Sequence, residues 1–148
     1  MIKLLRQPLI RLKMFKTNIK IRFNHVDAAG IVFYPRYYEM LNQVVEEWFE
    51  QKLDIDFQTL YRKYAAGVPA VSIQTDFPNA CSLGDMLEFR LEVEKLGNSS
   101  INLGITAKTA GKICLEAKMT LIYVLRQCEG KISPTKIPDV LRNAMLAS

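Results

Sequence analysis

The sequence predicts an α+β domain in which a curved antiparallel sheet of about five strands wraps around one long helix. The first observation is an amphipathic helix expected over residues 34–51, close to the start of the chain. The second is a series of four strand-like segments that follow it, separated by turns rich in glycine and asparagine. A helix with a broad apolar face needs a surface to cover it, and an antiparallel sheet provides one.

The composition fits a single soluble domain. The chain has 148 residues, of which 49% are hydrophobic and 24% are charged, so it can form one hydrophobic core. It contains no apolar run near the roughly 20 residues that a membrane span needs. We therefore expect a basic N-terminal arm over residues 1–14 and one domain over residues 15–148, without a membrane span.

Charge and cysteine content exclude several classes of protein. The net charge is +5, but the sequence has no basic repeat with interleaved aromatic residues, so nucleic acid is not an expected partner. Its three cysteines form no CxxC motif, and it has one histidine, so no metal site is expected. Reduced thiols of this kind indicate a cytoplasmic protein.

The first strand is expected over residues 15–23. Apolar and basic residues alternate there, which places Phe15, Ile19, Ile21 and Phe23 on one side. A loop follows over residues 24–33.

The long helix begins near Pro35, a residue suited to the first turn because its missing N–H needs no partner there. Asn42 interrupts its apolar face at helical spacing from Tyr38 and Val45. A polar residue at such a position is either a hydrogen-bonded core residue or part of a ligand pocket, and the first interpretation is preferred.

The rest of the chain reads as a crossover followed by strands. Residues 54–66 form a short helix or an irregular connection, and residues 109–112 form a hairpin turn. The last strand is apolar on both sides near residues 121–125, and a short helix follows Pro138. The four expected strands are residues 68–77, 87–93, 101–107 and 113–126.

Asp27 is the first candidate for chemistry. With Gly30 three positions later it has the pattern of an ordinary type I turn, and this structural role is one interpretation. A functional role for Asp27 is the favoured interpretation, because the turn leads into a helix start through the apolar residues Ile31, Val32 and Phe33. Apolar residues in a loop are typical of a pocket or an interface.

Two neighbours could act with this carboxylate. His25, the only histidine, points to the same side as position 27 in extended geometry, and it either orients Asp27, handles protons, or binds loop backbone groups. Tyr34 matters for its backbone N–H, which is unpaired at the helix N-terminus and strengthened by the helix dipole. A carboxylate beside such a donor suits acyl transfer, in which the donor stabilises an oxyanion.

The residues around this turn resemble the signature of the 4-hydroxybenzoyl-CoA thioesterase family of hotdog-fold proteins. Further similarity appears over residues 72–77, 83–85 and 96–100, so the resemblance covers roughly residues 16–128. The residues that match the signature, which opens the family's central helix, are Asp27, Gly30, Ile31, Val32, Phe33 and Tyr34.

The resemblance implies a hotdog fold and the hydrolysis of an acyl-CoA thioester. It implies that Asp27 is the catalytic carboxylate and that the Tyr34 N–H is the oxyanion donor, with Ile31, Val32, Phe33 and Asn42 as candidate substrate-binding residues. His25 stands where many relatives have a second Asp, which favours an aromatic, benzoyl-type acyl group. A hotdog acyl-CoA dehydratase and a non-enzymatic acyl-CoA-binding protein remain alternatives.

The resemblance also implies a homodimer or homotetramer, with subunit pairing that covers the last strand and an apolar outer face of the sheet. No cofactor or metal is expected, since coenzyme A is part of the substrate. The basic residues suggested for its phosphates are Arg90, Lys95, Lys108 and Arg126.

Overall fold

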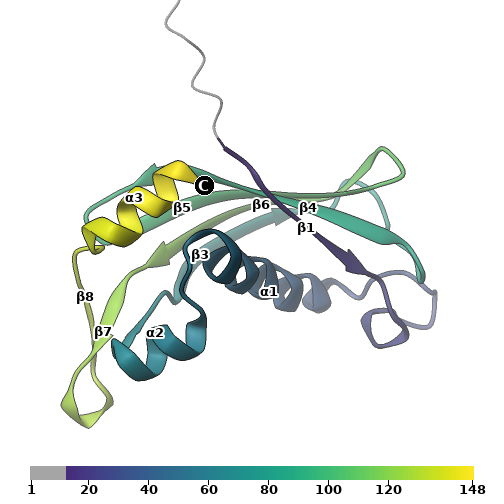
Figure 1. The fold of residues 1–148 in the computed structure, drawn as a ribbon. Helices are drawn as coiled ribbons and strands as arrows, with labels where there is room; N and C mark the ends of the chain where they lie inside the picture. Colours follow the sequence, from purple (N-terminus) through teal and green to yellow (C-terminus); the bar gives the residue numbers. More distant parts are fainter. Residues whose placement is uncertain (1–12) are drawn as a thin grey trace, which may run out of the picture.

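A computed structural model describes residues 13–148 of the chain, so the predicted arm falls outside it except for its last two residues. The fold has the predicted order of elements, a strand, a long helix, a short helix and then further strands (Figure 1). The elements are β1 (Phe15–Lys20), the 3-10 helix η1 (Phe23–His25), α1 (Tyr34–Lys52), α2 (Phe57–Lys63), β2 (Ala66–Gly67), β3 (Ala70–Asp76), β4 (Met86–Leu96), β5 (Ser100–Thr109), β6 (Lys112–Ile122), β7 (Val124–Arg126), the 3-10 helix η2 (Cys128–Gly130), β8 (Ile132–Pro134) and α3 (Asp139–Ala147).

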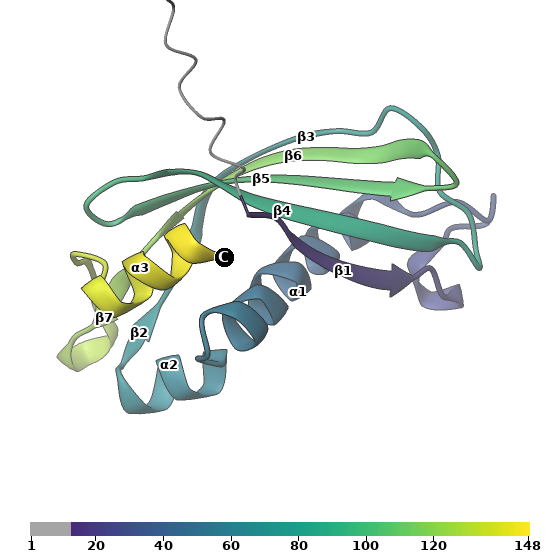
Figure 2. The same cartoon turned by 45° about the horizontal axis from the view of Figure 1, so that its top comes forward.

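The main sheet has five antiparallel strands in the order β1-β4-β5-β6-β3, and α1 lies along its concave side (Figure 2). Trp48, Phe49 and Leu41 of α1 are fully buried against inward-facing strand residues such as Leu103 and Ile105. Each large apolar side chain buried in this way stabilises the fold by about 1.5–3 kcal/mol. The predicted α+β architecture is therefore confirmed. Among the described residues, no helix is long and apolar enough to cross a membrane.

The convex face of the sheet is polar, and the predicted apolar outer face is wrong. The strands alternate, so the residues that face away from α1 on β4 are Glu88, Arg90, Glu92 and Glu94. This face needs no hydrophobic cover, because its side chains can be hydrated directly.

The first strand ends earlier than predicted. Ile21 still pairs with the turn between β3 and β4, since its N–H donates to the Asp85 carbonyl at 2.8 Å and its carbonyl accepts from Gly84. Beyond it the chain turns into η1, which leaves Phe23 83% exposed instead of on the apolar side of a strand.

The last predicted strand is divided between two sheets. β6 ends at Ile122, and β7 joins β2 and β8 in a separate three-stranded sheet. Tyr123 lies at the change, where its N–H donates to the Ser99 carbonyl at 2.8 Å. Tyr123 and Val124 are consecutive and both buried. The strand is apolar on both sides because it serves two sheets of the same chain, so subunit pairing is not required to explain it.

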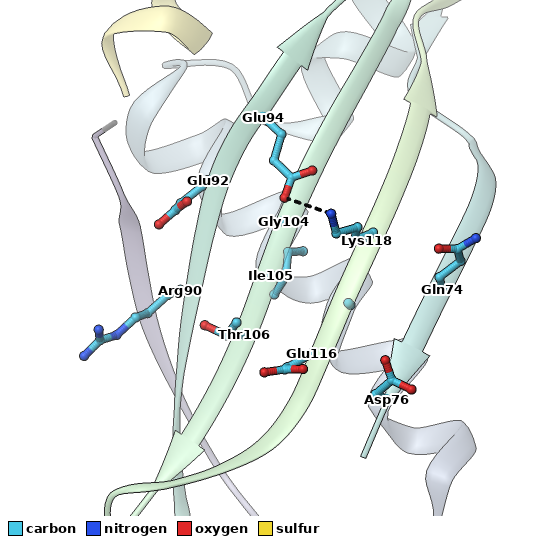
Figure 3. A pocket seen from close by; sticks show the side chains of 11 residues that line it. Gln74, Asp76, Arg90, Glu92, Glu94, Gly104, Ile105, Thr106, Glu116 and Lys118 are labelled. Carbon is cyan, nitrogen blue, oxygen red and sulfur yellow. Dashed lines mark ion pairs between the residues drawn. The ribbon is translucent and has the colours of Figure 1, made fainter. Parts of the chain in front are cut away.

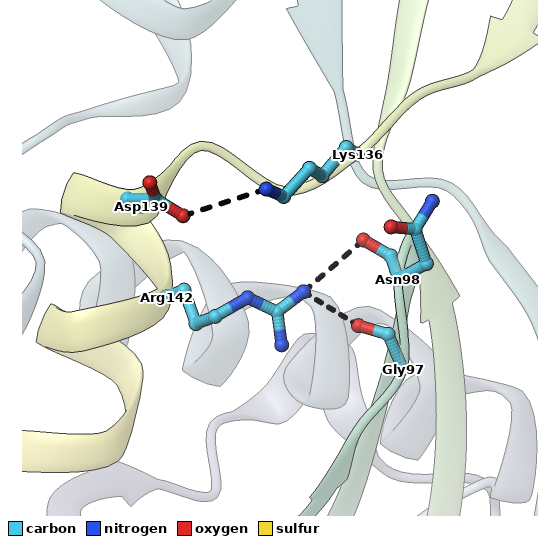
Figure 4. A network of polar contacts seen from close by, with 5 residues as sticks. All are labelled: Gly97, Asn98, Lys136, Asp139 and Arg142. Atoms are coloured by element: carbon cyan, nitrogen blue, oxygen red, sulfur yellow. Dashed lines mark hydrogen bonds and ion pairs between the residues drawn. The ribbon is translucent and has the colours of Figure 1, made fainter.

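Helix α3 covers the end of the main sheet and is attached at both ends. The Arg142 Nη2 donates to the carbonyls of Gly97 and Asn98, at 2.6 and 3.2 Å, in the turn between β4 and β5 (Figure 4). At its other end, the Trp48 indole N–H donates to the Ser148 hydroxyl at 3.0 Å. These contacts fix α3 across the C-terminal end of α1.

Candidate active site

The loop that carries Asp27 is a small backbone-bonded hairpin. Val26 and Val32 form an antiparallel bridge, and the Asp27 N–H donates to the Ile31 carbonyl at 3.0 Å. The Gly30 N–H closes the turn on the Asp27 carbonyl, also at 3.0 Å. Gly30 has a φ of +75°, a conformation that glycine adopts without strain. The predicted turn is present, and its tip projects the carboxylate outward.

The Asp27 carboxylate is held on one side only. Its Oδ1 accepts the Ala29 N–H at 2.9 Å, whereas its Oδ2 has no hydrogen-bond partner within residues 13–148. The side chain is exposed. One oxygen therefore fixes the orientation of the carboxylate, and the other is available to a water molecule or a substrate.

The N-terminus of α1 lies at the end of the same hairpin. Phe33 is the residue before the helix, and its own N–H is bound to the His25 carbonyl at 3.0 Å. Tyr34 and Pro35 follow as the first two helical residues, and in the described part of the chain the Tyr34 N–H is not engaged in a hydrogen bond. This amide is an open donor, and the helix dipole adds partial positive charge to it.

An apolar pocket of about 230 Å³ opens beside this amide. Ile31, Val32 and Tyr34 line it, as the sequence suggested for the first two. Tyr37 and Phe77 also line it, and their rings stack with centroids 5.2 Å apart. The pocket thus places an aromatic surface next to Tyr34, at the end of the hairpin that carries Asp27.

The segment after β3 completes this pocket, and the sequence did not single it out as part of the site. The Val32 N–H donates to the Cys81 carbonyl at 2.9 Å, and Ile31 bridges Ser82. The Leu83 N–H reaches the Gly30 carbonyl at 3.0 Å. The one signal was the match of residues 83–85 to the family pattern, which carried no information about where that turn lies.

His25 binds the backbone and does not contact Asp27. Its Nδ1 accepts the Arg22 N–H at 2.9 Å, so the proton of the neutral ring is on Nε2. Burial, followed by the nearby Arg36 guanidinium, lowers the pKa of His25, and the imidazole is neutral near pH 7. Of the interpretations left open, binding of loop backbone groups is the one that the geometry supports.

Phe33 and Asn42 lie outside the pocket. The Phe33 ring is 47% exposed and meets the Tyr34 ring edge-on, with centroids 5.6 Å apart. Asn42 lies two turns further along α1 on its exposed side, where its Nδ2 donates to the Glu46 Oε1 at 3.1 Å. The preferred interpretation of Asn42 as a core residue is wrong, because the helix phase turns it away from the sheet.

The two buried thiols near the pocket are not activated. Cys81 lines the pocket, and both thiols are buried. Burial raises the pKa of Cys81 to about 12 and also raises the pKa of Cys114. A thiol that stays protonated is a poor nucleophile. Asp27 is thus the ionisable side chain that the hairpin presents next to the open amide.

A second hollow, of about 350 Å³, lies on the convex face of the sheet around Gly104 (Figure 3). Acidic side chains outnumber basic ones in its lining, and the Lys118 ammonium is 4.0 Å from the Glu94 carboxylate. Phosphate groups would be repelled here. Its charged residues are Asp76, Glu92, Glu94, Glu116, Arg90 and Lys118. In residues 13–148, no group of His, Cys, Asp and Glu side chains is arranged to hold a metal ion.

The basic residues suggested for coenzyme A do not form one patch. Arg90 pairs with Glu88 at 2.6 Å on the convex face, close to the acidic hollow. Arg126 lies in the second sheet, where its guanidinium stacks on the Tyr61 ring at 3.6 Å from the centroid. Lys95 lies near the end of β4 and Lys108 near the end of β5, and the register of the two strands places them at opposite ends of the β4–β5 pair.

Solved structures of known enzymes share this fold. A gentisyl-coenzyme A thioesterase is 22% identical, with a TM-score of 0.77 over 90% of this chain and 100% of that chain. The 1,4-dihydroxy-2-naphthoyl-CoA thioesterase from Synechocystis is 18% identical, with a TM-score of 0.78 over 90% and 96%. The 4-hydroxybenzoyl CoA thioesterase from Pseudomonas sp. strain CBS-3 is 19% identical, with a TM-score of 0.79 over 88% and 98%. Among curated proteins, none matches the sequence significantly.

A long helix enclosed by a five-stranded antiparallel sheet is the architecture of the hotdog fold, which these solved structures share with the chain. The chain belongs to the thioesterase-like superfamily, whose family model matches residues 21–145. The resemblance found in the sequence, including its hotdog fold, is confirmed.

Proposed function

We propose that this protein hydrolyses an aromatic acyl-CoA to the free acid and coenzyme A at the Asp27 hairpin. The observation that carries the proposal is the pairing of two unoccupied groups at the head of α1. One is the free Oδ2 of Asp27, and the other is the open N–H of Tyr34. An apolar pocket that can take the acyl group is lined by Tyr34 and by Ile31 and Val32 of the hairpin that carries Asp27.

In the proposed reaction, the Tyr34 N–H donates a hydrogen bond to the thioester carbonyl and stabilises the negative charge that develops on its oxygen. Asp27 either attacks the carbonyl carbon or removes a proton from an attacking water. The carbon–sulfur bond then breaks, and coenzyme A leaves as its thiolate, which takes up a proton from solvent. A mixed anhydride with Asp27, where it forms, is cleaved by water in a second step.

The aromatic preference is supported by the pocket walls and by the related enzymes. The rings of Tyr37 and Phe77 stack face to face, and an aromatic ring of this kind offers a flat surface to an aryl group. Tyr34 lines the same pocket. The three similar thioesterases are named for gentisyl, dihydroxynaphthoyl and hydroxybenzoyl esters of coenzyme A.

We propose that the working form is a homodimer or homotetramer in the cytoplasm. Val71 is 61% exposed on β3, an edge strand whose outer backbone groups are open to another chain. Tyr38 and Phe77 are also exposed beside the pocket, as expected for a site completed by a second subunit. The unpaired thiols fit a reducing compartment. Light scattering that gives a monomer mass at micromolar concentration would contradict the assembly.

Thiol release from a panel of acyl-CoA esters tests the function. We expect kcat/KM for benzoyl-CoA, 4-hydroxybenzoyl-CoA and 1,4-dihydroxy-2-naphthoyl-CoA to exceed that for acetyl-CoA and decanoyl-CoA at least tenfold, the scale set by about 1.4 kcal/mol of differential binding. A preference for decanoyl-CoA would reject the aromatic assignment. Absence of thiol release from every ester would reject the hydrolase.

A single turnover in water labelled with ¹⁸O tests the nucleophilic role of Asp27. Hydrolysis of an anhydride at the Asp27 carbonyl carbon leaves label in the protein, and mass spectrometry of the peptide that contains Asp27 detects it. General-base catalysis, like water attack at the acyl carbon of an anhydride, puts all of the label into the free acid. Label in the peptide therefore demonstrates that Asp27 is the nucleophile.

A further inference from the structure

The C-terminal end of α1, opposite to the Asp27 hairpin, borders a larger cavity of about 440 Å³. It lies between the end of α1, helix α2, the junction of β6 and β7, and the start of α3. Its volume is within the range of about 300–1,000 Å³ typical of small-molecule sites. The apolar part of its wall consists of Leu53, Ile55, Leu60, Pro138, Val140 and Leu141.

Tyr123 presents an unused hydroxyl to this cavity. Its side chain is 4% exposed and contributes to the lining, and its hydroxyl makes no hydrogen bond to any described residue. The hydroxyl oxygen is not among the polar atoms of residues 13–148 that are both shielded from solvent and without a partner, so it is open to the space of the cavity. The backbone holds the residue in place, because the Tyr123 N–H is bound to Ser99 at 2.8 Å and its carbonyl accepts from Thr135 at 3.0 Å. A ligand in the cavity can therefore take the place of water at this hydroxyl.

The polar groups of the lining favour a ligand that accepts hydrogen bonds. Burial raises the pKa of Tyr123, with a smaller effect from the Tyr64 phenol, so Tyr123 stays protonated and acts as a donor. The Lys63 ammonium lies 5.3 Å from the centroid of the Tyr64 ring and has no carboxylate partner within residues 13–148. Asp54 supplies the one carboxylate of the lining. The lining therefore contains two phenols and an ammonium, which can donate hydrogen bonds to a ligand, and one carboxylate.

We propose that this cavity is a second binding site, for a medium-chain monocarboxylic acid. The aliphatic chain lies against the apolar wall, and the carboxylate accepts a hydrogen bond from Tyr123 and pairs with Lys63. No residue of this cavity belongs to the Asp27 site, so the proposal does not depend on thioester hydrolysis. Binding would engage the Tyr123 hydroxyl and connect α2 to α3.

Decanoate titrated into the full chain by calorimetry, with thermal unfolding in parallel, tests the site. We expect one decanoate per chain and an unfolding temperature that rises with ligand concentration, because the ligand binds the folded state. Tyr123→Phe should weaken binding about tenfold, the scale of a hydrogen bond to a charged group. Without ligand it should unfold at about the same temperature, since the lost hydroxyl has no hydrogen-bond partner among residues 13–148 and is open to solvent.

Three further variants sharpen the test. Lys63→Gln should weaken decanoate binding, whereas Tyr61→Phe and Lys52→Gln, close by but outside the cavity lining, should leave it unchanged. Val140 is 80% exposed, so the Val140→Asp variant should fold normally. Because residue 140 lines the cavity, the new aspartate should repel the carboxylate of decanoate and weaken its binding. Decanoate binding that survives Tyr123→Phe and Lys63→Gln unchanged takes place elsewhere and overturns the proposal.

The ligand class is tested with analogues of the same chain length. Decanol, which lacks the charge, should bind at least tenfold more weakly than decanoate. Equal binding of decanol, or tighter binding of decylamine through Asp54, would overturn the carboxylate assignment. Failure of decanoate to bind at millimolar concentration would overturn the site itself.

Discussion

The two ends of α1 carry sites of opposite construction. At its N-terminus, the carboxylate and the open amide of the candidate active site both lie within residues 27–34, and the carboxylate is exposed. At its C-terminus, the cavity is built from side chains of residues 53–64, 123 and 138–141, and its central phenol is buried. The first site depends on local chain geometry, and the second depends on how distant segments pack.

This difference predicts how each site responds to substitution. The hairpin holds its shape through backbone hydrogen bonds, so exchanging one exposed side chain there should change chemistry more than stability. The cavity exists only while α2 and α3 stay in place, so loosening either helix should change ligand binding and stability together. Four substitutions, in decreasing order of expected effect, test this contrast.

Asp27→Asn should have the largest effect. Asparagine also fits the first position of a type I turn and can accept the Ala29 N–H, so the hairpin should survive. The anion is lost, and kcat for thiol release should fall by roughly 100-fold or more. Thermal unfolding and decanoate binding should stay as in the wild type.

The control for this experiment is Asp76→Asn on the convex face, which should release thiol at the normal rate. Asp27→Ala should additionally lose stability, because it removes the acceptor for Ala29. If Asp27 were only a turn residue, Asp27→Asn would hydrolyse a good ester normally, and most of the proposed mechanism would be wrong.

The local site was largely predictable because its information is contiguous. The Asp27–Gly30 turn, the helix start at Pro35 and the open Tyr34 amide follow from residue preferences over a few positions. His25 was ambiguous, since its partner is the backbone of Arg22 in a 3-10 turn that alternation cannot reveal. Asn42 was misassigned because its neighbours on the helix face were judged without knowing which side meets the sheet.

The fold class was predictable, whereas the second cavity was not. Alternation over residues 101–107 identifies a strand buried on one side, and this alternation recurs in the neighbouring strand β4. The change of sheet at Tyr123 leaves no local pattern, because two consecutive buried residues also fit one strand buried on both sides. The cavity at that change combines four segments whose contacts are set by tertiary packing.

Arg142→Met should have the next largest effect and should act at the cavity end. Methionine keeps the length of the side chain but removes the donor to the Gly97 and Asn98 carbonyls. We expect a loss of about 1–2 kcal/mol in the free energy of unfolding, typical of a hydrogen bond to a charged donor in a partly exposed place. Decanoate binding should weaken, while thiol release per folded molecule should stay normal.

Lys136→Met is the matched control for α3. Its ammonium lies 3.9 Å from Asp139 in an exposed pair three residues apart, so its removal should change stability by less than about 0.5 kcal/mol. Equal effects of the two substitutions in urea unfolding would mean that the Arg142 contacts do not hold α3.

Gly30→Ala should cost less and act at the hairpin end. No atom lies within 4 Å of the added methyl group, so the cost comes from the φ of +75° alone, about 1 kcal/mol. Gly67→Ala is the control, because its methyl group would meet Val124 at an ordinary 3.9 Å without a positive φ. Urea unfolding should show the loss for Gly30→Ala, together with reduced kcat and unchanged decanoate binding.

The smallest effect should be the pH dependence that His25 adds to stability. Because its pKa is lowered in the folded protein, folding favours the neutral ring, whose Nδ1 accepts the Arg22 N–H. This contribution is complete above the unfolded value near 6.5 and is lost as the pH falls through the lower folded value. Asparagine offers a similar acceptor that does not titrate, so His25→Asn should lose less stability than the wild type between pH 8 and pH 5. Since His25 is the only histidine, parallel stability curves for the two proteins would show that its ring does not secure the hairpin.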